Sequence, residues 1–376
     1  MLRILLSIGL VLLVLGGALT YMARRSMSLC PALSRHPRLV WGFFGLFLGA
    51  MFLVPLINRW ANHQADYLYW LSYGLFSFVS TYLVYLAVAD FGQVIAQRWT
   101  SAPVGLWAFR VALGATVLSV LVGLIMAVRQ PQIKQVEVAI AGLPKGLEGF
   151  RIVQISDLHL GPLVPMAKVQ LLVERTNELK ADLIAITGDL VDGEANGVQA
   201  KAERMASLRA SHGVFFVTGN HEYYSGIAKW IPIIKGLGWK TLDNGHELIE
   251  RQQAQLAVLG MPDPAARGRR GNGQGPNLAK ALEGIPEGTT KLLLFHPPTG
   301  FEAADKAGIA LQLSGHTHSG QYFPWSLFIP WLYRFPKGLN RQGALWIYTS
   351  VGTGFWGPPN RFLVAPELTV LTLRRA

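Results

Sequence analysis

Four long apolar runs in the first third of the chain limit what it can fold into. A helical apolar stretch of about 20 residues matches the hydrocarbon thickness of a bilayer. A helix is stable there because it satisfies its backbone hydrogen bonds internally. Tyrosine and tryptophan gather at the edges of the runs, as they do at bilayer interfaces. The runs span residues 2–22, 39–57, 67–89 and 104–128. We therefore expect residues 1–132 to form a transmembrane anchor region of about four helices.

The first run has a second interpretation, a cleaved signal peptide, because it begins with a basic residue and has small residues near its end. Against this interpretation, the run is long and lacks a clean small-x-small site before a polar stretch. Three further apolar runs also follow it. We favour a membrane helix.

Charged residues are divided unevenly along the chain. Residues 1–132 contain nine Lys or Arg and only two acids, Asp66 and Asp90, both outside the apolar runs. The net charge of +12 is about +7 in these residues and +5 in the rest, where acids and bases are nearly balanced. This distribution favours basic residues that flank membrane helices and argues against a nucleic-acid-binding surface. Because the runs contain no acid or histidine, we expect an anchor and not a transport pathway.

The basic residues also predict an orientation. The loop after the first run holds Arg24, Arg25, Arg35 and Arg38, and the loop after the third run holds Arg98. Cytoplasmic loops are enriched in Lys and Arg. Placing these two loops in the cytoplasm gives a multi-pass protein with both termini, and hence the catalytic domain, on the extracytoplasmic side.

From residue 133 the pattern changes to short β-rich runs punctuated by Gly, Asn and Asp. Helical periodicity recurs between several of them, and a hairpin is expected at 246–260. We expect strands at 133–140, 151–156, 183–187, 214–218, 246–251, 255–260, 291–295, 309–313, 345–350 and 367–373, and helices at 166–180, 197–210, 226–236, 277–283 and 300–307. This alternation predicts an α/β domain over residues 133–376, with mixed sheets covered by helices.

Five polar clusters each follow a predicted strand. They contain Asp157 and His159, then Asp189, then Asn220 with His221 and Glu222, then His296, and finally His316 and His318. Sites in open α/β sheets assemble at the carboxyl ends of strands, so we expect the five clusters to converge.

The side chains of these clusters suit a metal site. Carboxylates, imidazoles and an amide oxygen favour divalent Mn, Fe or Zn, and the single Cys30 excludes a thiolate cluster. A carboxylate such as that of Asp189 can bridge two metals about 3.5–4 Å apart. A single histidine is more often structural, but five of the nine histidines fall in these clusters. We interpret the other four as structural or solvated; they are His36, His63, His212 and His246.

The order D-x-H, G-D, G-N-H-[D/E], H and G-H-x-H resembles the calcineurin-like metallophosphoesterase family over residues 148–376. The segments GFRIVQISDLHLG, ITGDLVDG and LQLSGHTHSGQ are most similar to its membrane-associated bacterial branch, which includes lipid A precursor hydrolase-like members. The resemblance implies a four-layer sandwich of two mixed β-sheets flanked by helices. It also implies two divalent metal ions, one held by Asp157, His159, Asp189 and His318 and the other by Asp189, Asn220, His296 and His316.

The same resemblance implies that His221 is a catalytic residue and not a metal ligand, and that it protonates the leaving oxygen or stabilises the transition state. The position fits this role, because an imidazole beside a ligand can present an N–H to a phosphoryl oxygen. Glu222 stands where many members have Asp. Two roles stay open for Glu222: orienting His221 or a loop backbone, or lying on the surface.

These features predict a membrane-anchored phosphoesterase in which a metal-bound hydroxide attacks phosphorus. We expect its substrate to be a phosphodiester or pyrophosphate in a lipid or nucleotide-linked lipid. The alternative is a membrane sensor or scaffold that binds a ligand without turnover, but no ligand of the expected set is missing. A nuclease would need a basic groove, which the charge of residues 133–376 does not favour.

Two segments bear on the substrate. The basic loop 265–276, with Arg267, Arg269 and Arg270, can meet phosphate groups, although a solvated loop is the favoured interpretation. The aromatic segment 322–335 either contacts lipid or folds inward as core and a capping loop. Pro297 and Pro298 follow His296, where relatives often have an acid, and this difference leaves the substrate open.

Overall fold

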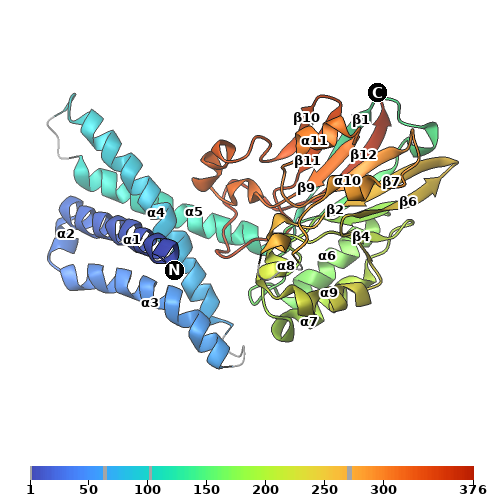
Figure 1. Ribbon diagram of the computed structural model, residues 1–376. Helices are drawn as coiled ribbons and strands as arrows, with labels where there is room; N and C mark the ends of the chain where they lie inside the picture. Colours follow the sequence, from blue (N-terminus) through green and yellow to red (C-terminus); the bar gives the residue numbers. More distant parts are fainter. Residues whose placement is uncertain (1, 62–65, 101–103, 269–272) are drawn as a thin grey trace. The chain divides into compact units, whose positions relative to one another are not determined.

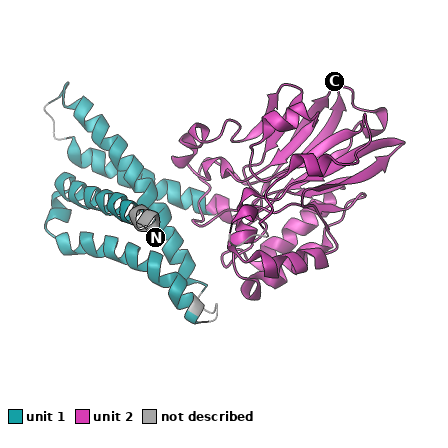
Figure 2. Ribbon diagram, viewed as in Figure 1, with its two compact units in different colours: residues 1–124 teal, residues 125–376 magenta. Residues whose placement is uncertain are grey.

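The computed structural model describes residues 2–61, 66–100, 104–268 and 273–376 (Figure 1). The chain divides into two compact units, residues 1–124 and 125–376 (Figure 2). Each unit is described by itself.

Four long helices and one short helix, α2, make up the described part of the first unit. They are α1 Leu2–Leu29, α2 Pro31–Ser34, α3 Pro37–Trp60, α4 Leu68–Ala96 and the first part of α5 Gly105–Val128. Within the described residues, three helices are long and apolar enough to cross a membrane: Pro37–Asn58, Leu68–Ala96 and Gly105–Val128. The first predicted run forms α1, and the side chains at its beginning lie outside the described residues. The transmembrane region is thus confirmed for three candidate spans.

One acid does not lie where the sequence predicts. Helix α4 continues to Ala96, so Asp90 lies inside a candidate span and not in the loop after it. The Asp90 carboxylate accepts hydrogen bonds from the Tyr21 hydroxyl and from Arg25 Nε, both at 2.6 Å. A carboxylate paired in this way avoids the cost of an isolated charge in an apolar layer, which explains why the helix can include it.

Two mixed sheets of six strands each form the centre of the second unit, within the described part of the chain. In order, the first sheet contains β1 Gln132–Ile140, β12 Glu367–Arg375, β2 Arg151–Ile155, β3 Leu183–Ile186, β4 Val214–Phe216 and β5 Lys240–Thr241. The second contains β10 Gly338–Gln342, β11 Leu345–Thr349, β9 Leu311–Ser314, β8 Thr290–Leu294, β7 Ala254–Gly260 and β6 Gly245–Arg251. Strands β2 to β5 run parallel, as do β7, β8, β9 and β11.

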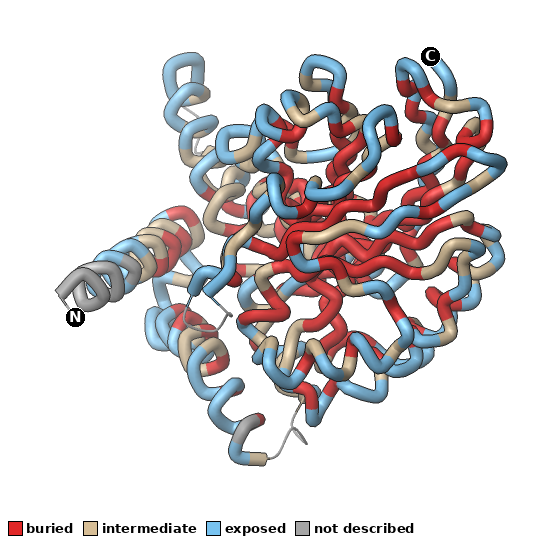
Figure 3. The backbone as a smooth tube through the Cα atoms, turned by 45° about the vertical axis from the view of Figure 1, so that its right-hand side comes forward, coloured by how far each residue is buried: buried red, intermediate tan, exposed pale blue. Residues whose placement is uncertain are grey.

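Alternating apolar side chains hold the layers together. In β2, Ile152 packs into the core between the sheets, whereas Val153 and Ile155 pack outward against helices. The outer face of the first sheet is covered by α6 Met166–Glu178, α7 Ala195–Arg204 and α9 Ile227–Gly236. The outer face of the second sheet is covered by α10 Leu278–Leu282 and α11 Phe301–Lys306. Buried residues accordingly follow the strands through the centre of this unit (Figure 3). The predicted sandwich of two mixed sheets flanked by helices is confirmed.

The sequence does not predict two of the strands. Strand β5 has two residues, and β10, with the sequence GLNRQ, lacks an apolar alternation. The short helix α8 Asn220–Tyr224 begins inside the third polar cluster, which the sequence predicts only as a strand end.

Candidate metal centre

The carboxyl ends of five strands bring together the seven predicted metal ligands. The segments that follow β2, β3 and β4 carry Asp157, His159, Asp189 and Asn220, the last at the start of α8. The segments that follow β8 and β9 carry His296, His316 and His318. Ligand atoms of Asp157, His159 and His318 lie within 4.8 Å of one another, and so do those of Asp189, His296 and His316. The two groups can therefore each surround one ion.

The first group is closely spaced. His159 Nε2 and His318 Nε2 are 3.0 Å apart, and His318 Nε2 is 3.3 Å from Asp157 Oδ1. Asp189 Oδ2 lies 3.8 Å from His159 Nε2. Ligands bound about 2.1 Å from one metal ion lie about 3–3.5 Å apart, so these separations suit a shared cation.

The second group shares Asp189 with the first. His296 Nε2 lies 3.1 Å from Asp189 Oδ2, and His316 Nδ1 lies 2.9 Å from Asn220 Oδ1. Asp189 Oδ1 accepts a hydrogen bond of 2.8 Å from the His221 backbone N–H, which leaves Oδ2 directed at both groups. A carboxylate in this position can bridge two ions.

One nitrogen shows that the donor set fits a metal ion. His296 Nδ1 lies 2.7 Å from the Thr187 carbonyl and donates its proton there, so Nε2 of the neutral ring carries a lone pair. That Nε2 is buried and has no hydrogen-bond partner, yet it lies 3.1 Å from a carboxylate oxygen. Two lone pairs at this distance require a positive charge, either a proton on the ring or a bound cation. A divalent ion meets this requirement for Asp189 and His296 together.

The protonation states also suit metal binding. Burial alone would raise the carboxyl pKa values, but neighbouring histidines outweigh it and lower the pKa of Asp157 and Asp189. Burial lowers the pKa of His159 to about 3 and that of His316 to about 4. Ionised carboxylates and neutral imidazoles are the forms that bind metals. His296 differs: although burial lowers its pKa, the Asp189 charge outweighs this and raises it well above the ordinary value.

Five of the seven predicted ligands have a left-handed backbone. Their φ angles are 53° for Asp157, 49° for His159, 50° for Asp189, 71° for His316 and 47° for His318. Such angles are uncommon for residues with a Cβ and cost about 1–3 kcal/mol each where they are strained. Their concentration at one set of strand ends indicates that side-chain placement there overrides backbone preference.

Two glycines make room for the carboxylates. A Cβ on Gly219 would collide with the Asp189 carboxylate, and a Cβ on Gly315 would collide with the carboxylate of Asp157 and the hydroxyl of Ser156. The glycines of the G-N-H and G-H-x-H motifs therefore allow one loop to cross directly over the ligand of another.

Glu222 is buried and supports the loop backbone. Its carboxylate accepts hydrogen bonds of 2.6–3.2 Å from the backbone N–H groups of Gly219, Asp189, Leu190 and Val191. Burial raises the pKa of Glu222 to about 8, with the Asp189 charge adding to the effect. Of the two roles that the sequence left open, the surface position is wrong, because Glu222 is fully buried.

His221 lies beside the candidate ligands, and its side-chain hydrogen bond is to Asp192, which is not a predicted ligand. Its Nδ1 is 3.0 Å from Asp192 Oδ1, and the two rings of His221 and His159 meet edge to face at 4.6 Å. Burial lowers the pKa of His221, but the hydrogen bond to Asp192 outweighs it and raises the pKa. Ligand atoms of His159, Asp189 and His221 also lie within 4.8 Å, so the geometry permits His221 to reach an ion.

Three residues at the site were not predicted from the sequence. Asp192 orients His221, and its only signal is its place in ITGDLVDG, three residues after Asp189. Arg361 is fully buried, and its Nη2 lies 3.0 Å from His318 Nδ1. Tyr333, in the aromatic segment, has its hydroxyl 2.9 Å from His316 Nε2. The last two come from segments without a motif, so only the tertiary structure shows them.

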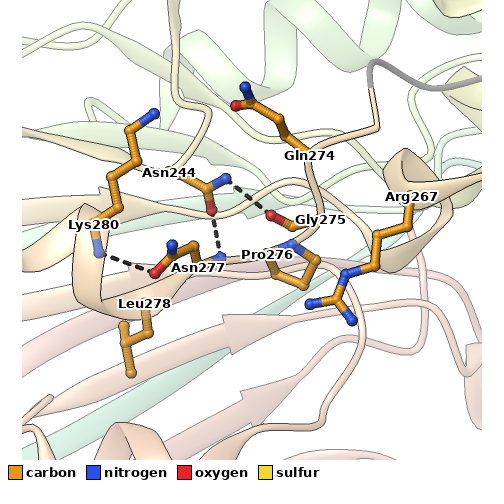
Figure 4. Close-up of a pocket in the computed structure, with 8 residues that line it drawn as sticks. All are labelled: Asn244, Arg267, Gln274, Gly275, Pro276, Asn277, Leu278 and Lys280. Carbon is orange, nitrogen blue, oxygen red and sulfur yellow. Dashed lines mark hydrogen bonds between the residues drawn. The ribbon is translucent and has the colours of Figure 1, made fainter.

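The basic loop lines a separate cavity of about 670 Å³. Asn244 connects its walls: Asn244 Nδ2 donates to Gly275 O at 3.0 Å, and Asn244 Oδ1 accepts from the Asn277 N–H at 2.6 Å (Figure 4). The cationic side chains Arg267 and Lys280 line this cavity, but none of the predicted metal ligands does. Arg269 and Arg270 lie outside the described residues.

Comparison with known proteins agrees with this arrangement. Residues 150–320 match the family model of the calcineurin-like phosphoesterases. The chain is 32% identical over 326 residues to a transmembrane protein with metallophosphoesterase domain from Danio rerio, which covers 82% of this chain and 75% of that protein. A Bos taurus protein with the same description is 37% identical over 271 residues, 69% of this chain and 61% of its own.

An uncharacterized metallophosphoesterase of Helicobacter pylori is 34% identical over 246 residues, covering 65% of this chain and 64% of that protein. The chain thus spans under two thirds of the Bos taurus and Helicobacter pylori relatives. The motifs, the two-sheet fold and these relatives agree, and the chain belongs to the calcineurin-like phosphoesterase family, with candidate metal-binding groups and candidate membrane spans.

Proposed function

We propose that this protein is a membrane-anchored phosphoesterase with two divalent metal ions that hydrolyses a phosphodiester or pyrophosphate. In this proposal residues 1–132 are the anchor and residues 133–376 the catalytic domain. The observation that carries it is the pair of ligand groups that share Asp189, whose Oδ2 lies 3.8 Å from His159 Nε2 and 3.1 Å from His296 Nε2.

Each ligand has an assigned place. Asp157, His159, Asp189 and His318 would hold one ion, and Asp189, Asn220, His296 and His316 the other. Two such metal ions, of Mn, Fe or Zn, would supply Lewis acidity at phosphoryl oxygens and would make hydroxide available near neutral pH. Backbone N–H groups fix the ligand carboxylates, because Asp157 accepts from the His316 N–H at 3.0 Å and Asp189 from the His221 N–H at 2.8 Å.

His221 is the residue we assign to the leaving group. Asp192 fixes the orientation of the imidazole through Nδ1 and favours its protonated form, which can donate a proton to a departing oxygen. The ring edges of Tyr224 and Trp356 flank His221, with centroids at 5.4 and 5.9 Å. This aromatic surround supports a substrate with an apolar part beside the phosphate, such as a lipid or a nucleotide-linked lipid.

Hydrolysis of bis(p-nitrophenyl) phosphate by the full chain in nanodiscs tests the proposal. We expect metal-dependent turnover that falls at least about a hundredfold in Asp189→Ala and in His316→Ala. The exposed Glu287→Ala serves as a matched control and should keep full activity. Full activity in Asp189→Ala would refute the two-metal site. Bound metal without any turnover of phosphodiesters or pyrophosphates would favour the sensor or scaffold instead.

A further inference from the structure

A belt of exposed apolar side chains borders the candidate metal centre. We call it the aromatic rim and define it as the exposed residues of two segments, 322–335 and 355–363. Trp331 is 80% exposed, Leu332 75%, Leu363 68% and Trp356 51%, and Leu327 and Phe328 are also exposed. Side chains of this size and number are unusual on a surface that faces only water.

The two segments form one surface. Gln321 Nε2 donates to the Trp356 carbonyl at 2.8 Å, and Gln321 Oε1 accepts from the Trp356 N–H at 2.7 Å. The Phe323 N–H donates to the Phe362 carbonyl at 2.9 Å, and the two rings meet edge to face. Loops far apart in the sequence are thus fixed side by side, so that their exposed side chains act together.

The rim is connected to the metal ligands. The Tyr333 hydroxyl lies 2.9 Å from His316 Nε2, two residues along the chain from Trp331. On the other segment, the Trp356 ring lies 5.9 Å from the ring of His221. A molecule resting on the rim would therefore meet the centre from the side of His221 and His316.

The charge around the rim points to an anionic surface. No Asp or Glu occurs between Asp305 and Glu367, a stretch that contains both rim segments. The same stretch contains five bases, of which Arg334 and Lys337 are exposed immediately after Tyr333. Aromatic and basic side chains without acids are the combination found where proteins lie in the headgroup layer of a bilayer.

The rim also lies next to the end of a candidate membrane span, within the second unit. Lys168 Nζ donates to the carbonyl of Ala127, in the last turn of α5, at 2.6 Å. The same Nζ lies 5.7 Å from the ring centroid of Phe355, the neighbour of Trp356. Arg175 Nη1 donates a hydrogen bond of 3.1 Å to the Pro131 carbonyl, so the residues after α5 are hydrogen-bonded to α6. Lys168 therefore contacts both the last turn of α5 and Phe355, the residue that precedes Trp356 of the rim.

We infer that the aromatic rim docks on the anionic bilayer surface beside the end of α5 and presents lipid-borne phosphoesters to the metal centre. The inference rests on the proposed function for its second part, because presentation matters only if the centre cleaves phosphoesters. The docking part rests on three observations: the exposed apolar side chains, the stretch between Asp305 and Glu367 without Asp or Glu, and the contacts of Lys168 with Ala127 and Phe355.

A fluorescent label tests the docking directly. In the full chain with Cys30→Ser, which removes the only native thiol, an environment-sensitive fluorophore is attached at Leu332→Cys or, as the control, at Glu250→Cys. Glu250 is exposed on β6 and pairs with Gln255 at the start of β7, away from the strand ends that carry the ligands. In anionic nanodiscs, headgroup-labelled nitroxide lipids should quench the label at 332 severalfold more than at 250. Equal quenching at the two positions would overturn the docking. The same result is expected if a protein partner, and not the bilayer, covers the rim.

A second arm tests presentation. The double variant Trp331→Ser with Leu332→Ser should lose at least about tenfold in kcat/KM on a phospholipid with a p-nitrophenyl phosphodiester headgroup, held in the same nanodiscs. Hydrolysis of soluble bis(p-nitrophenyl) phosphate should be unchanged. Equal loss on both probes would show a structural role, and no loss on either would show no role; each result overturns presentation. If the native chain cleaves neither probe and no pyrophosphate, the proposed function fails and presentation with it, while the quenching result still decides docking.

Discussion

At the scale of single residues, the candidate centre depends on side chains that hold the ligands. Glu222 accepts four backbone hydrogen bonds. Asp192 lies 3.0 Å from His221 Nδ1 and 3.8 Å from His159 Nδ1, and Tyr333 contacts the ring of His316. Partners of this kind set ligand orientation and typically change metal affinity or activity 10–100-fold when removed. Glu222 supports the loop backbone, whereas Asp192 orients His221, the proposed proton donor, so we expect different effects when each is replaced.

Replacing Glu222 with Ala should destabilise the catalytic unit. The change leaves four backbone N–H groups without their acceptor in a buried loop, which we expect to cost about 3–5 kcal/mol and to release bound metal. Unfolding by denaturant, together with metal analysis of the full chain, measures both effects. The exposed Glu287→Ala should show neither. A loss of stability below about 1 kcal/mol would contradict the role of Glu222 in supporting the loop backbone.

Replacing Asp192 with Asn should reduce turnover and leave the metal in place. His221 loses the carboxylate that orients it, so we expect kcat on bis(p-nitrophenyl) phosphate to fall about 10–100-fold while metal content stays native. Asp189→Asn is the contrasting variant, because it should lose metal as well. If Asp192→Asn also lost its metal, Asp192 would be supporting the site itself and not His221.

The sequence predicts the ligands better than their supports. Five motifs at strand ends were sufficient to name seven candidate ligands, and the fold brings these seven residues together. Asp192 is adjacent to a motif but shares its type with many solvated acids, and Arg361 and Tyr333 lie in segments that carry no pattern. The left-handed backbone at Asp157 and Asp189 is also invisible in sequence, since it results from packing around the site.

At the scale of elements, strong periodicity decided which parts of the fold could be predicted. Strands such as β2 and β3, whose apolar residues fill both faces, match the predicted runs closely. The short strand β5 and the polar strand β10 could not be predicted, because tertiary pairing alone makes them strands. Helix α4 extends past its apolar run to Ala96, and the added part includes Asp90, which accepts hydrogen bonds from Arg25 and Tyr21.

The Lys168 link between α6 and the end of α5 gives a pH dependence. Burial, helped by the Arg361 charge, lowers the pKa of Lys168 from 10.5 to about 8. Between these values the unfolded chain binds more protons than the folded chain, so stability should rise as pH increases from about 8 to 10.5, by at most about 3 kcal/mol. Lys168→Met should remove this contribution. Denaturant midpoints of the native chain and of Lys168→Met, measured from about pH 8 to 10.5, test this expectation. If the stability of both proteins changed equally with pH, Lys168 would not be the source of the pH dependence.

At the scale of the whole molecule, the unequal charge of the loops predicts a sidedness. Cytoplasmic placement of the loops with Arg24, Arg25, Arg35, Arg38 and Arg98 puts the C-terminal unit outside the cytoplasm. An alkaline phosphatase fused after Ala376, which is active only outside, should therefore be active. Fluorescence from a green fluorescent protein at the same position, which needs the cytoplasm, would contradict the orientation.

Metal stoichiometry tests the central claim most directly. Elemental analysis of the purified full chain should find two divalent ions per chain, about one in His316→Ala, and fewer than one in Asp189→Ala, because both ligand groups share that carboxylate. A native chain that binds fewer than one ion, or an Asp189→Ala variant that keeps two, would contradict the two-metal centre.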